Sequence, residues 1–160
     1  MCAWSARHLE ASPERRRVLR LISLLVLAPP ILQRSRAAAA GGEASAFAAG
    51  SLATALRDLD AAPVESTQVA LVVPEFVENG AVVPVEVTSA FSGLQNIFVF
   101  SEANPFPLVA RFTIPEGTEA FVSTRIKVAR SCNIVAVVET AGRFFSAVRA
   151  TQVTIGGCGA

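Results

Sequence analysis

The spacing of hydrophobic and polar residues changes near residue 63, and this change divides the chain into two parts. In residues 43–59, apolar side chains recur every three or four positions, as they do on one face of an amphipathic helix. The turn-forming stretch 58–63 ends this pattern. Beyond it, apolar residues come in short runs that are separated by turn residues, as in β-strands. The sequence therefore predicts an N-terminal helix followed by an all-β domain.

Seven of the apolar runs are predicted to be strands, at residues 67–73, 82–88, 96–101, 108–114, 120–129, 133–140 and 143–155. In the run 120–129 the even positions 122–128 carry Val, Thr, Ile and Val, and the odd positions 123–127 carry Ser, Arg and Lys. Such alternation is typical of a strand with one buried face. About seven strands in roughly 90 residues favour an immunoglobulin-like sandwich of two sheets.

Three connections between these strands can also be predicted. Asn79-Gly80 and Ala141-Gly142 are expected to form tight turns, the first as a hairpin, because Asn and Gly tolerate positive φ. Residues 102–107 include Pro105 and Pro107, which would interrupt a central strand, so this segment is expected to connect two strands.

The amino end has the pattern of an export signal. Three arginines, Arg15 to Arg17, precede a short apolar run at residues 21–28, which is too short to span a bilayer. The pair Arg15-Arg16 is followed by one further residue, then two apolar residues and a basic residue. This order is typical of bacterial twin-arginine signals. We therefore expect a signal peptide at residues 1–40, cleavage within 37–40, and a periplasmic mature protein.

Charge and residue inventory exclude several classes of function. The formal net charge is +1, which predicts no basic patch for nucleic acid. The single histidine, His8, lies in the predicted leader, so the mature chain would have no Ser-His or Cys-His pair and no histidine-ligated zinc or haem. Cys132 and Cys158 are too few for a metal cluster within one chain. No cofactor is expected.

The carboxyl end carries the candidate chemistry. Cys158 stands between Gly156-Gly157 and Gly159, on a segment with no side chain large enough to be buried. Its nearest basic neighbour in sequence is Arg149, so no local group activates the thiol. This pattern predicts a swinging arm that presents Cys158 to the active site of another protein. Cys132 opens an apolar run and is expected to be a buried structural residue.

The expected organisation is a signal peptide at 1–40, a helix and linker at 41–62, a sandwich at 63–155 and a tail at 156–160. Several segments of this chain are similar to the SoxY family of bacterial sulfur-oxidising systems. They are Val153 to Gly159 at the terminus, Pro74 to Gly80 followed by Val83 to Val85, Glu102 to Pro107, and Ser123 to Ile126.

The resemblance implies an immunoglobulin-like sandwich whose cysteine, here Cys158, holds thiosulfate-derived intermediates covalently. It implies a heterodimer with SoxZ and transient contacts with SoxAX, SoxB and, where present, SoxCD. It also implies a carrier rather than an enzyme, which agrees with the inventory above.

Two other functions remain open at the level of the sequence. The sandwich could be a periplasmic binding module with an inert tail. Alternatively, Cys132 and Cys158 could form the redox pair of a thiol redox protein, although they lack the Cys-x-x-Cys spacing.

Overall fold

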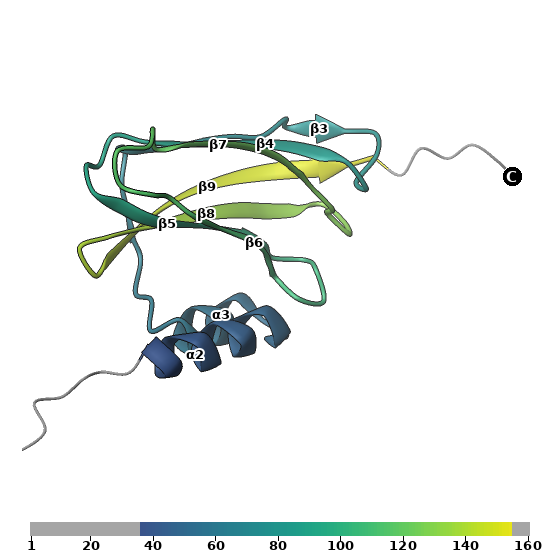
Figure 1. Cartoon of the computed structure of the whole chain (residues 1–160). Coiled ribbons are helices and arrows are strands. Elements are labelled where there is room, and N and C mark those ends of the chain that lie inside the picture. Colours follow the sequence, from purple (N-terminus) through teal and green to yellow (C-terminus); the bar gives the residue numbers. More distant parts are fainter. Residues whose placement is uncertain (1–35, 155–160) are drawn as a thin grey trace, which may run out of the picture. The chain divides into compact units, whose positions relative to one another are not determined.

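The described part of the chain is a β-sandwich with a pair of helices on one side (Figure 1). The computed structural model describes the backbone of residues 36–154 and the side chains of residues 42–154. Most of the predicted leader, residues 1–35, and the predicted tail, 156–160, lie outside this range. Within it, no helix is long and apolar enough to cross a membrane.

Two sheets form the sandwich, as the sequence predicted. The larger sheet has the order β1 (Val64–Glu65), β9 (Arg143–Val153), β8 (Cys132–Thr140), β5 (Leu94–Ser101) and β6 (Leu108–Thr113), and β3 (Phe76–Val77) also pairs with β9. The smaller sheet has the order β2 (Val69–Val72), β4 (Val83–Ser89) and β7 (Phe121–Ile126). The seven predicted strands coincide with β2 and β4 to β9. The two-residue strands β1 and β3 were not predicted.

The core between the sheets explains the alternation in the sequence. On β4, the side chains of Val83, Val85 and Val87 are fully buried while their neighbours face solvent. In β7 and the two residues after it, the even positions from 122 to 128 are half-buried or buried and the odd positions from 123 to 127 are exposed, as predicted. In contrast, β5 and β8 are buried almost continuously. Strands that read as continuous apolar runs are covered on both faces.

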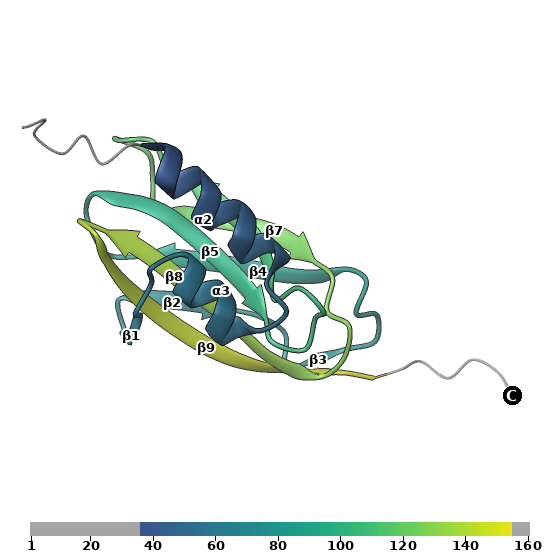
Figure 2. The same ribbon diagram turned by 90° about the horizontal axis from the view of Figure 1, so that it is seen from below.

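The helices provide the second cover. The helices α2 (Arg36–Ala48) and α3 (Leu52–Asp58) lie on the outer face of the larger sheet (Figure 2). Small side chains on the helices allow close approach to a patch of large residues on β5, β6 and β8. The buried members of this second core are Ala46, Ala49, Ala55, Phe98, Phe100, Leu108, Val135 and Val137.

The prediction of a single helix over residues 43–59 was wrong. The chain leaves helical geometry at residues 49–51, and Ser51 caps α3 by accepting a hydrogen bond from the amide of Thr54 at 3.2 Å. Ser is a favoured N-cap residue, but its position inside a helical pattern hid this signal. The Ser45 hydroxyl donates to the carboxylate of Asp58 at 2.6 Å and so joins the two helices.

Of the two predicted turns, only one forms a hairpin. Ala141 and Gly142, with φ of 48° and 71°, connect the paired strands β8 and β9. Asn79-Gly80 does not form a hairpin, because β3 pairs with β9 whereas β4 pairs with β2 and β7. Instead, the carbonyl of Gly80 accepts a hydrogen bond from the amide of Val128 at 2.7 Å. The connection predicted at 102–107 is confirmed.

Close packing, and not a positive φ, requires glycine at residue 80. We therefore expect alanine to be more destabilising at Gly80 than at Gly50. A Cβ at residue 80 would collide with the carbonyl oxygen of Val128, a backbone atom that cannot rotate away. We expect Gly80→Ala to lower the free energy of unfolding by about 1–3 kcal/mol. Gly50→Ala, whose Cβ would have no described atom within 4 Å, should change it by no more than about 0.5 kcal/mol. Urea unfolding of both variants measures this, and equal stabilities would contradict the close-packing account.

Candidate functional site

The site predicted from the sequence lies beyond the last described residue. Cys158 and its glycine neighbours Gly156, Gly157 and Gly159 are outside the described residues, which end at Thr154. The structure does define the point at which this segment leaves the sandwich. We call residues 151–154 the tail root.

The tail root is held on both edges of β9. On one edge, Thr151 lies opposite Cys132 of β8, and the hydroxyl of Ser131, the residue before β8, accepts the amide hydrogen of Val153 at 2.9 Å. On the other edge, β3 pairs in parallel with β9, so that Gln152 donates its amide hydrogen to the carbonyl of Glu75 at 2.7 Å and Thr154 donates to the carbonyl of Val77 at 2.9 Å. Every backbone amide from 152 to 154 thus has a partner.

A buried side-chain hydrogen bond reinforces this anchor. Thr151 is only 1% exposed, and its hydroxyl donates to the carbonyl of Pro74 at 2.7 Å. The bond joins the segment before β3 to the end of β9, which are 77 residues apart in sequence. Figure 1 shows that β9 ends next to β3, at one end of the sandwich.

The surroundings of the tail root contain few reactive groups. A shallow hollow of about 290 Å³ is lined by residues 78–81, residues 127–129, Val153 and Thr154. Its charged side chains are one carboxylate, Glu78, and one ammonium group, Lys127. No histidine, cysteine or serine is among the residues that line it. This hollow can contact a ligand or a partner.

Cys132, which was predicted to be buried, is partly buried. Its Sγ lies 3.5 Å from the Ser101 hydroxyl, and its side chain packs against the core between the sheets. It forms no disulfide with a described residue. A pairing with Cys158 involves a residue outside the described range, so the redox hypothesis stays a hypothesis.

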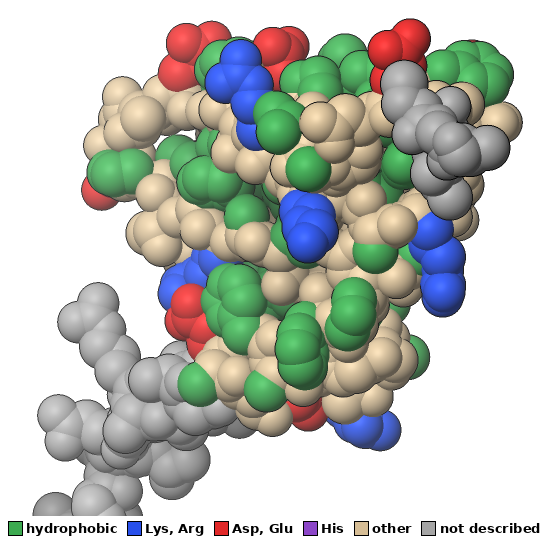
Figure 3. All heavy atoms as spheres, turned by 90° about the vertical axis from the view of Figure 1, so that its right-hand side faces the viewer, with side chains coloured by type: hydrophobic (Ala, Val, Ile, Leu, Met, Phe, Trp, Pro, Cys, Tyr) green, Lys and Arg blue, Asp and Glu red, His purple; other side chains and the backbone are tan. Residues whose placement is uncertain are grey.

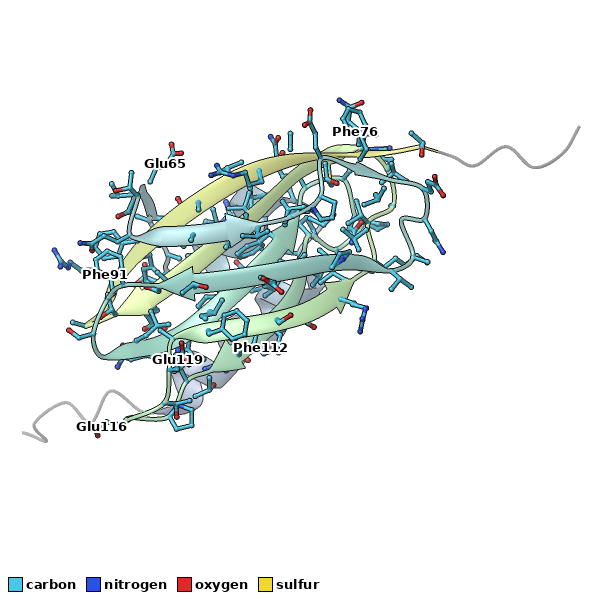
Figure 4. All side chains as sticks on the ribbon, turned by 90° about the horizontal axis from the view of Figure 1, so that it is seen from above. Glu65, Phe76, Phe91, Phe112, Glu116 and Glu119 are labelled. Carbon is cyan, nitrogen blue, oxygen red and sulfur yellow. The ribbon has the colours of Figure 1, made fainter. Side chains whose placement is uncertain are left out.

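A larger hollow, of about 900 Å³, lies between the loops at residues 89–95 and 114–120. Figure 4 places Phe91, Glu116 and Glu119 at the end of the sandwich opposite the tail root. Both glutamates are exposed on a loop, and no nucleophile accompanies them apart from hydroxyl groups. In residues 42–154 no three His, Cys, Asp or Glu side chains gather as metal ligands do. The larger hollow contains no cysteine or histidine among the residues that line it, and it lies away from the segment that leads to Cys158.

Comparison with known proteins identifies the family. The sequence pattern of the family described as "SoxY: Sulfur oxidation protein SoxY" matches residues 55–158. The match covers more than half of the chain, and includes every strand of the sandwich and Cys158. The chain belongs to the SoxY family. The matched region includes the tail root and ends at Cys158, the cysteine that the sequence analysis singled out.

A solved SoxY structure agrees with this assignment. The chain is similar to the sulfur carrier protein SoxY from Chlorobium limicola f thiosulfatophilum, with 39% identity over 62% of this chain and 92% of that chain, at a TM-score of 0.56. A superoxide reductase (neelaredoxin) from Ignicoccus hospitalis matches at 17% identity over 54% of this chain and 80% of that chain, at a TM-score of 0.46. No match was found among the curated proteins.

Sequence analysis missed the anchor of the tail root. β3 has only two residues, and its bonds to β9 use backbone groups that any sequence supplies. In the sequence, the segment Pro74 to Gly80 was noted for its family resemblance and for the turn expected at Asn79-Gly80, and no strand was predicted there. The one local signal is Pro74, which has no amide hydrogen to donate and therefore tends to lie outside a regular ladder.

The buried Thr151 hydroxyl predicts a local loosening when it is removed. Thr151→Val keeps the shape of the side chain but leaves the Pro74 carbonyl without its donor. We expect the free energy of unfolding to fall by about 1–3 kcal/mol, and amide hydrogen exchange at Gln152 and Thr154 to accelerate. Thr88→Val, at an exposed position of β4, is the matched control and should change neither quantity. Unchanged exchange in Thr151→Val would show that the hydroxyl does not hold the tail root.

Proposed function

We propose that this protein is a sulfur carrier that holds thiosulfate-derived intermediates on the thiol of Cys158 and presents them to partner enzymes. The observation that carries this proposal is the match to the SoxY family, because it extends through Cys158. The similarity to a sulfur carrier protein SoxY of known structure supports it. The proposed role is that of a covalent carrier and not of an enzyme.

The geometry of the described residues suits such a role. The tail root is anchored on both edges of β9, and Cys158 follows it by four residues. Four extended residues span about 13 Å. An anchored root gives partner enzymes a defined starting point, and a glycine-rich segment of this length lets a thiol enter a narrow active site.

The chemistry of loading can be written in balanced form. The thiol RSH and thiosulfate combine to give RS–S–SO₃⁻, one proton and two electrons, so an S–S bond forms and the two sulfur atoms are oxidised. A haem c partner of the SoxAX type would accept the electrons. Hydrolysis of the adduct then gives RS–S⁻, sulfate and two protons, and a SoxB-type partner would catalyse this step.

The remaining partners and the location are part of the same proposal. SoxZ would be the partner subunit, and SoxCD, where present, would oxidise the sulfane sulfur that hydrolysis leaves. The proposed location is the periplasm, reached by the twin-arginine route, because three arginines precede an apolar run in the leader. If cleavage falls within 37–40, it cuts in α2 and leaves the side chains that contact the sheet, from Glu43 onward, on the mature protein.

Mass spectrometry of the loaded protein tests the carrier role. Incubated with thiosulfate and the haem partner, the protein should gain a thiosulfonate on the peptide that contains Cys158. Cys158→Ser should abolish this mass increase and thiosulfate-dependent turnover, since it removes the sulfur atom that bonds to the substrate. Cys132→Ala is the control, and we expect it to load normally with a loss of stability of about 1 kcal/mol.

Two results would contradict the carrier role. Turnover that survives Cys158→Ser would favour a binding module with an inert tail. A disulfide between Cys132 and Cys158 that cycles during turnover would favour a thiol redox protein.

The length of the tail gives a separate prediction. Deletion of Gly156 and Gly157 shortens the reach by about 7 Å, so we expect partner-dependent turnover to fall by about 100-fold or more. Replacement of both glycines by serine keeps the length and should preserve most of the turnover. Reaction of Cys158 with a small alkylating reagent should be equal in all three proteins. A deletion that leaves turnover intact would contradict the need for reach.

A further inference from the structure

A rigid loop near the tail root holds an aromatic side chain in solvent. Phe106 is 58% exposed and lies between Pro105 and Pro107, which restrict the backbone. Asn104 fastens this loop to the segment after β7: its amide group donates to the carbonyl of Lys127 at 2.8 Å and accepts the amide hydrogen of Ala129 at 2.9 Å. The exposure of Phe106 is therefore a property of a fixed loop.

Two cations that form no ion pair with a described residue stand next to this loop. Arg125 and Lys127, with Phe106, line a hollow of about 500 Å³, and none of the residues that line it is acidic. Neither the guanidinium group of Arg125 nor the ammonium group of Lys127 forms an ion pair with a described residue. The half-buried cation Arg111, in contrast, is paired with Glu43. We call Phe106, Arg125 and Lys127 together the Phe106 surface.

The Phe106 surface adjoins the tail root. Lys127 lines both this hollow and the smaller one that Val153 and Thr154 line. Figure 3 looks onto the end of the sandwich at which β9 ends, and shows Lys and Arg side chains with hydrophobic ones among them and with Asp and Glu side chains mostly along its upper edge. A protein that receives the tail in its active site is thus brought directly against the Phe106 surface.

We propose that the Phe106 surface is the docking site for an enzyme that receives the tail, and that this enzyme has an acidic rim and an apolar pocket beside its entrance. The proposal rests on the proposed function. Two unpaired cations favour an acidic partner because complementary charge speeds encounter and sets orientation. An exposed aromatic side chain on a rigid loop is a typical anchor, since little conformational freedom is lost on binding.

A purely structural explanation of the cations makes a different prediction. Within the described residues, β6 and β7 each pair with a strand on one side only, and charged side chains protect such open edges from aggregation. Glutamate would protect an edge as well as arginine or lysine does. Edge protection therefore tolerates charge reversal, whereas docking on an acidic rim does not.

The test uses the full mature protein with its partner subunit, and measures the rate at which the haem partner and thiosulfate load Cys158. We expect Arg125→Glu with Lys127→Glu to lower kcat/KM for loading at least about tenfold, and more than Arg125→Gln with Lys127→Gln. Rising ionic strength should slow loading of the parent protein and have little effect on the reversed variant. Phe106→Ala should lower kcat/KM about tenfold.

Matched variants control for exposure and charge. Phe121 is 45% exposed at the opposite end of β7, and Arg57 is exposed on α3, so Phe121→Ala and Arg57→Glu should load normally. Alkylation of Cys158 by a small reagent should be unchanged in every variant, because it needs no docking. Circular dichroism and the Gln variants show whether the reversed protein is folded.

The outcomes separate this proposal from the function on which it rests. If the parent protein loads and the reversed variant loads equally well, the docking site is wrong and the carrier role stands. If the parent protein and Cys158→Ser behave alike, the carrier role itself is wrong. If the reversed variant loses its partner subunit or changes its oligomeric state while loading by the enzyme is unchanged, the Phe106 surface is a subunit interface and the docking proposal is overturned.

Discussion

The pairing of β9 with β8 is the constraint on which the rest of the structure depends. β8 is buried on both faces, since Ile134, Ala136 and Val138 pack into the sandwich and Val135 and Val137 pack under the helices. β9 follows β8 from the hairpin at Ala141-Gly142 to the tail root. Movement of β8 would expose two cores at once, so the end of β9 has a fixed place relative to both sheets.

This constraint separates the two requirements of a covalent carrier. The described residues around the tail root supply hydrogen bonds and shape, and no reactive pair of side chains lines the hollow there. Under the proposed function, the surface around the tail root decides which partner enzymes can bind. The groups that react with the sulfur atom are supplied by those enzymes. A rigid sandwich with an aromatic side chain and two cations beside the root fits this division, because association needs a stable surface and transfer needs only reach.

Much of the β-structure could be predicted because it depends on neighbours close in sequence. Val83, Val85 and Val87 alternate with exposed residues, and that period of two is visible without any knowledge of the partner sheet. The helix break at Ser51 was missed because the apolar spacing continues through it. The prediction of a hairpin at Asn79-Gly80 was wrong because a sequence does not show whether a glycine is needed for a hairpin turn or for close approach of another backbone segment. Cys132 contacts the Ser101 hydroxyl of β5, and the sequence of β8 does not reveal this neighbour.

By itself the sequence determined the seven longer strands, the turn at residues 141–142, the cysteine among glycines and the lack of histidine after residue 8. Only the tertiary structure decided that β3 joins the edge of β9, that Thr151 bonds to Pro74, and that Asn104 fastens the Phe106 loop beside Lys127. The physical reason is the range of the interactions. The burial of alternate residues can be recognised from the periodicity of a short stretch of sequence. The other contacts join backbone and polar groups that are far apart in the chain, and nearly every sequence contains such groups.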